Sequence, residues 1–239
     1  MKRYVLLLLI PGFLLLINIY NSMAGNVDTG RADYSYREAV ENDAGKRDMC
    51  IFIDLNERQL YLFEGNKLVS RYAVAIGKPA SPSPIGVWKI KNMRKNWGSG
   101  FGSRWLGLNV PWGIYGIHGT NKPYTIGSAA SHGCFRMYNA DVEELYDRVD
   151  IGTPVVVYGG PYGNLGSDLT ELYVGDRSSK VLEVQKRLKN LGYYTGELDG
   201  IFGEGMKSAL IKYKKDHNLP LNDRVDFPTY KSLNIFLFE

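Results

Sequence analysis

Short runs in the middle of the chain alternate apolar with polar residues, and this period of two predicts β-strands. The runs are rich in Ile, Val, Tyr and Phe and are separated by turn residues, a spacing typical of an all-β domain. We expect strands at residues 50–55, 59–64, 67–76, 86–91, 105–109, 114–118 and 154–158. A proline-rich segment at 79–84 and a glycine-rich segment at 98–102 interrupt this pattern, and both suit loops that border a cleft.

One short helix is expected within this β-rich region. The predicted helix begins at Asp141, whose carboxylate is placed to cap it. Glu144 follows three residues later and completes the pattern of a capping box ahead of Leu145 and Tyr146.

The period of the apolar residues changes to that of helices in the last part of the chain. A first helical stripe ends at Gly192, and a second follows a turn-rich segment. A third helix is expected near Pro228, with Asp226 as its cap. The stripes consist of Val181, Val184, Leu188 and Leu191, and then of Met206, Leu210 and Tyr213.

These patterns predict a mainly β domain, a mixed β-sandwich with one short helix, followed by a small all-α domain of three helices. The expected segments are 1–24 (signal peptide or membrane anchor), 25–48 (polar linker), 49–160 (β domain), 161–177 (second linker) and 178–239 (three-helix domain). A domain as small as the last one has a small core, so we expect modest stability or support from the larger domain.

The first 24 residues have the composition of an export segment. Lys2 and Arg3 precede an apolar stretch at 4–19, which is long for a signal peptide and slightly short for a membrane span. Small residues at Ser22 and Ala24 fit cleavage after Ala24, and an uncleaved anchor fits the same segment. In both cases the rest of the chain lies outside the membrane, so we expect an exported protein of the cell envelope.

Composition and charge exclude only a few classes of protein. The formal charge of +4 is spread along the chain without a long block of one sign, so no nucleic-acid partner is expected. The 44% of hydrophobic residues excludes disorder throughout. Cys50 and Cys134 are too few for a disulfide-stapled scaffold. Cys50 lies in an alternating run and is expected to be a small buried hydrophobe.

Cys134 lies in a segment that combines the residue types of a cysteine nucleophile. A thiol is mostly protonated at neutral pH and needs a nearby imidazole to take its proton. His118 ends a predicted strand sixteen residues earlier, far enough to fold back to the sulfur, and His132 is a second candidate. Gly133 indicates a loop that presents backbone N–H groups, so the N–H groups of Gly133 and Cys134 are a candidate oxyanion hole.

Structural interpretations of the same residues remain open. Cys134 fits a buried hydrophobe, His118 a hydrogen-bonded core residue and His132 a loop residue. A zinc site is disfavoured because only His217 remains to complete a set of His118, His132 and Cys134, and the spacing matches no zinc finger. We expect no metal and no cofactor.

The segment Ser131-His132-Gly133-Cys134-Phe135-Arg136-Met137, with Ile117-His118-Gly119-Thr120 upstream, resembles the signature of the L,D-transpeptidase catalytic domain. The resemblance extends through residues 83–88 and 139–145 and covers about 110 residues, from 50 to 158. It implies Cys134 as the acylated nucleophile, His118 as the base, and the Gly119 carbonyl as the group that orients the ring. It further implies that His132 and Gly133 line the oxyanion loop.

Arg136 and Ser131 are implied as substrate contacts. The Arg136 guanidinium is able to hold a carboxylate in two-point fashion. A surface ion pair is the alternative for Arg136.

The resemblance also implies a reaction on peptidoglycan. The enzyme attacks the bond after the L-centre of diaminopimelate in a tetrapeptide stem and releases D-Ala. An amine of a neighbouring stem then gives a 3→3 cross-link, whereas water gives an L,D-carboxypeptidase. Carbapenem-type β-lactams are implied as covalent inhibitors of Cys134.

Residues 178–234 resemble the peptidoglycan-binding three-helix repeat, through Leu191-Gly192-Tyr193 and the segment 198–203. A wall-binding domain tethered to the enzyme raises the local substrate concentration. A monomer is expected, with a membrane contact if the N-terminal segment is uncleaved. Two other hypotheses stay open: a non-catalytic wall-binding protein, and a cysteine hydrolase switched by a disulfide between Cys50 and Cys134.

Overall fold

The computed structural model describes residues 48–235, which belong to one compact unit. The predicted signal or anchor at 1–24 and nearly all of the linker at 25–48 lie outside the described residues. Within the described range, no helix combines the length and the apolar character that crossing a membrane requires.

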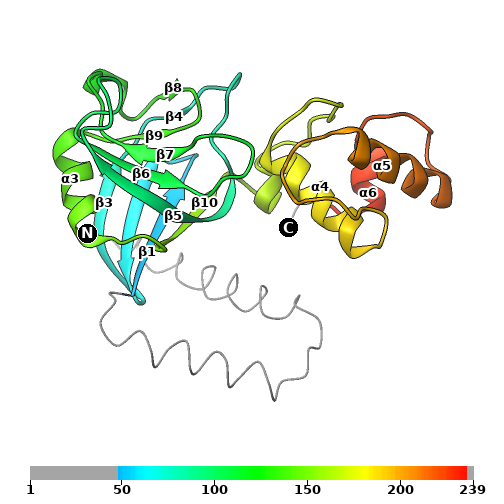
Figure 1. The fold of residues 1–239 in the computed structure, drawn as a ribbon, viewed down its shortest axis with the longest axis horizontal. Coiled ribbons are helices and arrows are strands. Elements are labelled where there is room, and N and C mark those ends of the chain that lie inside the picture. The colour runs from blue at the N-terminus through cyan, green and yellow to red at the C-terminus, as the bar shows by residue number, and fades with distance from the viewer. Residues whose placement is uncertain (1–47, 236–239) are drawn as a thin grey trace, which may run out of the picture. The chain divides into compact units, whose positions relative to one another are not determined.

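The first part of the described chain is built on one eight-stranded sheet (Figure 1), with strands in the order β3-β2-β1-β10-β5-β6-β7-β9. β1 pairs with β10 and β7 with β9 in parallel, and the other neighbours are antiparallel. β4 and β8 form a separate parallel pair. The strands are β1 (Met49–Asp54), β2 (Gln59–Glu64), β3 (Lys67–Ala73), β4 (Ile76–Gly77), β5 (Gly86–Lys95), β6 (Arg104–Leu108), β7 (Gly116–His118), β8 (Ala129–Ser131), β9 (Phe135–Arg136) and β10 (Pro154–Tyr158).

The sheet curls around a single core. Leu62 of β2 and Phe135 of β9 come from opposite ends of the strand order and still belong to one cluster of buried residues. Burial alternates along β1 and β5, as the period of two requires. The predicted mainly β fold is confirmed, with strands β2 and β10 at the expected residues and β5 four residues longer than expected.

α3 (Asn139–Arg148) packs against this domain and buries Val142 and Leu145. The predicted capping box at its start is wrong. The helix begins at Asn139, and its N-cap residue Tyr138 makes no side-chain cap hydrogen bond. Asp141 lies inside the first turn, where its negative charge interacts favourably with the helix dipole but does not cap the helix.

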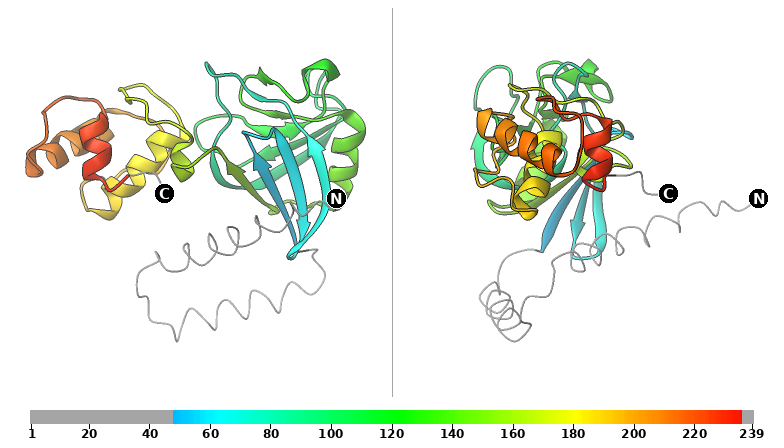
Figure 2. Two further views of the ribbon diagram at one scale, coloured as in Figure 1. Left: turned by 180° about the vertical axis from the view of Figure 1, so that it is seen from behind. Right: turned by 90° about the vertical axis from the view of Figure 1, so that its right-hand side faces the viewer.

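The remaining helices form the small all-α domain that the sequence predicts, grouped around a second core (Figure 2). They are α4 (Ser179–Asn190), α5 (Glu204–Asp216) and α6 (Phe227–Ser232), and short 3-10 turns occur at Pro123–Thr125 and Gly163–Leu165. The side chain of Asp226 accepts a hydrogen bond from the Thr229 N–H, so the predicted cap of the third helix is confirmed. Leu191 departs from its predicted stripe, because it follows the end of α4 and is exposed.

Candidate active site

The parallel pair β7 and β9 brings the His118 segment and the Cys134 segment together. Ile117 is in register with Phe135 and His118 with Arg136. Cys134 immediately precedes β9 and therefore lies beside Gly116, whose backbone makes a hydrogen bond with the thiol. His118, Arg136 and Cys134 occupy alternate positions on neighbouring strands, which places them on one face of the sheet.

The Cys134 side chain is largely enclosed. Its Sγ lies 3.9 Å from the carbonyl oxygen of Ile114. Burial raises the pKa of the thiol, while the backbone hydrogen bond of Gly116 and the positive charge of Arg136 oppose this rise. Cys134 is therefore a neutral thiol at neutral pH and requires a base to become a nucleophile. Both Cys134 and Cys50 are free cysteines.

His118 is buried at the end of β7 and its Nδ1 is hydrogen-bonded to the carbonyl of Gly119. Burial lowers the pKa of His118 to about 4, and the positive charge of Arg136 contributes to this lowering. The backbone hydrogen bond with Gly119 favours the protonated ring and acts in the opposite direction. The ring is therefore a neutral imidazole at neutral pH. Because Nδ1 bears the proton when it donates to a carbonyl, Nε2 is the unprotonated nitrogen and can accept a proton.

Within residues 48–235 no hydrogen bond joins the Cys134 thiol to the His118 ring. The structure places both on adjacent strands and exposes both to the charge of Arg136. Hydrogen bonds of catalytic groups are often long in the absence of substrate and tighten in the complex.

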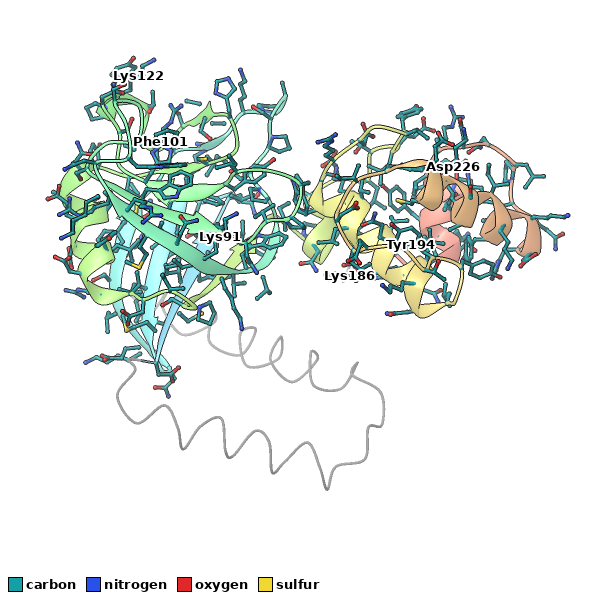
Figure 3. The ribbon with its side chains drawn as sticks, viewed as in Figure 1. Lys91, Phe101, Lys122, Lys186, Tyr194 and Asp226 are labelled. Atoms are coloured by element: carbon teal, nitrogen blue, oxygen red, sulfur yellow. The ribbon has the colours of Figure 1, made fainter. Side chains whose placement is uncertain are left out.

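Aromatic rings form a wall along His118. Trp105 lies 5.8 Å from the His118 ring at an interplanar angle of 29°, and Phe101 meets that ring edge to face at 5.1 Å. Phe101, labelled in Figure 3, belongs to the glycine-rich loop between β5 and β6. Trp97, which is 41% exposed, contacts Trp105 in a tilted arrangement, with ring centroids 4.2 Å apart and an interplanar angle of 41°. This wall keeps water from His118, and sequence reasoning did not assign these rings to the site.

Hydrogen bonds of the Ser131 side chain hold the loop that leads to Cys134. The Ser131 hydroxyl donates to the Cys134 carbonyl and accepts from the Gly133 N–H. Gly133 has a φ of +108°, and a Cβ there would lie 2.6 Å from Tyr115 Cε1, so only glycine fits this turn. Ser131 is buried, and its hydroxyl braces the loop. His132, by contrast, is exposed.

The Arg136 side chain is half-buried, and its positive charge acts on both the Cys134 thiol and the His118 ring. None of the ion pairs found within residues 48–235 involves it. A guanidinium without a carboxylate partner next to a nucleophile is suited to bind an anionic group of a substrate.

Asn139 fastens the turn that follows His118. Its Oδ1 accepts hydrogen bonds from the N–H groups of Ser103 and Thr120, each at 3.2 Å. A Cβ on Gly102 or on Gly119 would lie 2.2 Å from the same oxygen, so both positions require glycine. The Gly119 carbonyl that orients His118 is thus held by a side chain from the start of α3. The position of Asn139 directly after the cysteine motif was the only sequence signal for this role.

The described residues contain no candidate set of metal ligands. Among the described residues, no group of three or more His, Cys, Asp and Glu side chains lies close enough to hold a metal ion.

Comparison with known proteins finds a family match for each of the two domains. Residues 48–157 match the family "L,D-transpeptidase catalytic domain", and residues 177–233 match the "Putative peptidoglycan binding domain". The "Putative L,D-transpeptidase YqjB" of Bacillus subtilis is 32% identical over 125 residues, which cover 46% of this chain and 71% of that protein. The chain belongs to the L,D-transpeptidase family. The resemblance of its C-terminal residues to a peptidoglycan-binding domain is likewise confirmed.

Other L,D-transpeptidases are similar over the same part of the chain. The "Putative L,D-transpeptidase YkuD" of Bacillus licheniformis is 46% identical over 107 residues, or 45% of this chain, and the chain spans 64% of that relative's length. The solved catalytic domain of the Enterococcus faecium L,D-transpeptidase is 25% identical and has a TM-score of 0.41, covering 48% of this chain and 99% of that domain. The remainder of the chain lies outside these similarities.

Proposed function

We propose that the protein is an active L,D-transpeptidase that forms 3→3 cross-links in peptidoglycan. The observation that carries the proposal is the placement of Cys134, His118 and Arg136 on one face of two paired strands, with a neutral thiol beside a neutral imidazole. Each group is then in the protonation state that it needs before substrate binds.

In the proposed acylation step, the Cys134 sulfur attacks the carbonyl after the L-centre of diaminopimelate in a tetrapeptide stem. The thiol proton moves to Nε2 of His118 as the C–S bond forms, because the low pKa of the imidazole disfavours a preformed ion pair. The proton then passes to the nitrogen of the departing D-Ala, leaving a thioester on Cys134.

Backbone N–H groups of the Ser131–Cys134 loop are proposed to stabilise the negative oxygen of the intermediate. The Gly133 N–H is already bonded to Ser131, so the oxyanion competes with a neutral hydroxyl for this donor, and the Cys134 N–H provides a second one. Removing one such donor typically costs about 10²- to 10³-fold in rate.

Arg136 is proposed to bind a carboxylate of the donor stem. The positive charge of Arg136 also favours the Cys134 thiolate, against the burial that raises the pKa of the thiol, and it contributes to the lowered pKa of His118. His132 is proposed to line the mouth of the loop, and Ser131 to support it.

The remaining proposals concern the chain as a whole. We propose an exported enzyme whose β domain (49–160) acts on the stems while its C-terminal domain (178–239) holds it on the wall. We also propose that it works as a monomer and that carbapenem-type β-lactams acylate Cys134. The N-terminal segment would be either a cleaved signal or a membrane anchor.

Incubation of the protein with disaccharide tetrapeptides, followed by mass spectrometry of protein and products, tests the function. We expect an acyl adduct on Cys134, released D-Ala and a cross-linked dimer. A tripeptide product without a dimer would instead make the enzyme an L,D-carboxypeptidase. Absence of any adduct on the folded protein would refute both.

The two cysteines provide a matched control for this experiment. Cys134→Ala should abolish the adduct and turnover, whereas Cys50→Ala should retain most activity, because Cys50 is only half-buried in β1, which β10, β5 and β6 separate from β7. Equal loss of activity in the two variants would contradict this division of roles.

A further inference from the structure

The C-terminal domain meets the β domain at Gly200 and Trp112. Gly200 has a φ of +68°, and a Cβ there would lie 2.3 and 2.8 Å from Cε3 and Cζ3 of the Trp112 indole. The ring is therefore packed directly on the Gly200 backbone. Trp112 is 8% exposed, so this contact is part of a buried interface.

Two more contacts fix the same interface. The Ser179 hydroxyl, at the start of α4, accepts a hydrogen bond of 2.8 Å from the Ile85 N–H. Leu182 of α4 belongs to the hydrophobic core of the β domain, and Ile201 packs against that core. The helical domain thus contributes side chains to the interior of its neighbour, which a flexibly tethered domain does not do.

Trp112 in turn contacts the rings that surround the catalytic loop. Its ring centroid lies 6.3 Å from that of Tyr115, at an interplanar angle of 67°. Tyr115 lies against Gly133, whose added Cβ would be 2.6 Å from the Tyr115 ring. Gly133 precedes Cys134, and Ile114 of the same Trp112–Tyr115 segment supplies the carbonyl beside Cys134 Sγ.

We propose that Trp112 is a positioning residue that couples the C-terminal domain to the catalytic loop. Gly200 fixes the indole, the indole fixes Tyr115, and Tyr115 shapes the turn at Gly133 that presents the thiol and the oxyanion donors. The C-terminal domain is then a structural part of the active site as well as a wall anchor. This inference rests on the proposed role of Cys134 as the nucleophile.

The rate of Cys134 alkylation by iodoacetamide, followed across pH by mass spectrometry of the Cys134 peptide, tests the coupling without a peptidoglycan substrate. Gly200→Ala in the full chain should slow alkylation about tenfold and shift its pH profile, because misplacing a reacting group by about 1 Å costs up to about 10²-fold. Gly192→Ala is the matched control. It has a φ of +79° in the same domain, and nothing lies within 4 Å of the added Cβ.

A double-mutant cycle isolates the contact from the backbone strain. Trp112→Phe removes the ring that the Gly200 Cβ would strike, so Gly200→Ala should have at most about a twofold effect on alkylation in that background. The strain of alanine at positive φ is the same in both backgrounds and cancels. If Gly200→Ala does not fold, Ser179→Ala takes its place, with the exposed Ser208→Ala as its control.

Different outcomes test the proposed role of Cys134 and the coupling through Trp112. If wild-type Cys134 forms no acyl adduct with the disaccharide tetrapeptide, the proposed nucleophile fails. If wild-type Cys134 is reactive and folded Gly200→Ala matches Gly192→Ala in rate and pH profile, the coupling is overturned. Strict additivity of Gly200→Ala and Trp112→Phe would overturn it as well.

Discussion

Trp105 covers His118 with its indole ring, and it can do so because it lies over two glycines. A Cβ on Gly107 would come within 2.8 Å of the indole Nε1, and one on Gly116 within 2.7 Å of Cη2. The Nε1–H donates to Asn92 Oδ1 at 3.0 Å, which fixes the ring in its plane. The protonation state of His118 therefore depends on strands β5 to β7 packing closely around one indole.

Trp105→Leu should raise the pKa of His118 from about 4 towards 6.5, because water would reach the ring and burial is the main cause of its low pKa. It should also destabilise the fold by about 2–4 kcal/mol through the cavity it leaves. NMR titration of His118 and urea unfolding measure the two effects. Tyr124→Leu is the control, since Tyr124 is 81% exposed and should change both values little.

The low pKa of His118 links stability to pH. The unfolded chain binds a proton on this residue below pH 6.5, and the folded chain only near pH 4. Stability from the neutral ring is thus complete above pH 6.5 and is lost as the pH falls towards 4, amounting to about 3 kcal/mol. Urea unfolding of wild type and His118→Gln across this range should show the steeper loss in wild type. Parallel curves would contradict the assignment.

Asn139→Ala should lower kcat about tenfold with little change in KM, because the Gly119 turn that orients the base would lose its hydrogen bonds. Asn139→Asp keeps an acceptor oxygen for Ser103 and Thr120 and should rescue the turn. Its negative charge should raise the pKa of His118, which moves the acidic limb of the kcat/KM profile upward. Asn121→Ala removes one hydrogen bond to the neighbouring loop, at Ser99, and should leave the profile unchanged.

The buried pair of Lys214 and Asp226 should be the most sensitive polar point of the C-terminal domain. Lys214 Nζ is fully buried and donates to Asn222, the Arg224 carbonyl and Asp226. Burial alone would raise the pKa of Asp226, but hydrogen bonds from Thr229 and Asn222 and the charge of Lys214 lower it to about 2.

Lys214→Met should therefore cost about 3–5 kcal/mol, because it leaves Asp226 as an uncompensated buried charge. Calorimetric unfolding measures this loss. Lys215→Met, one position along α5 and exposed, should stay within about 0.5 kcal/mol of wild type. A similar loss in both variants would show that the pair contributes no special stability.

Local patterns predicted the fold where each element carries its own period. β2 and β10 alternate cleanly, and α6 has its capping aspartate in sequence. β4, β8 and β9 were not predicted, because strands of two or three residues are too short to show a period. The start of α3 was misplaced because the side chain of Asn139, at its first residue, binds two distant backbone groups, which no local pattern records.

The sequence likewise indicated some residues of the candidate site and gave no sign of others. The residue types and spacing of Cys134 and His118 indicate one chemistry, whereas Arg136 was implied only by the family resemblance, and the roles of all three stay predictions. The residues that hold them, among them Trp105 and Tyr115, act through contacts between segments far apart in sequence. Such contacts depend on strand pairing, and a single sequence does not specify them.

β3 is the outer strand of the eight-stranded sheet, and its edge has a consequence for contacts between copies of this protein. Lys67 and Arg71 project from it into solvent, and a bulge interrupts its pairing with β2. If a second molecule added its β3 strand at this edge, the positive charges of Lys67 and Arg71 would lie close to the same two charges of the second molecule. The edge thereby disfavours edge-to-edge aggregation, and neighbouring copies can work side by side without polymerising.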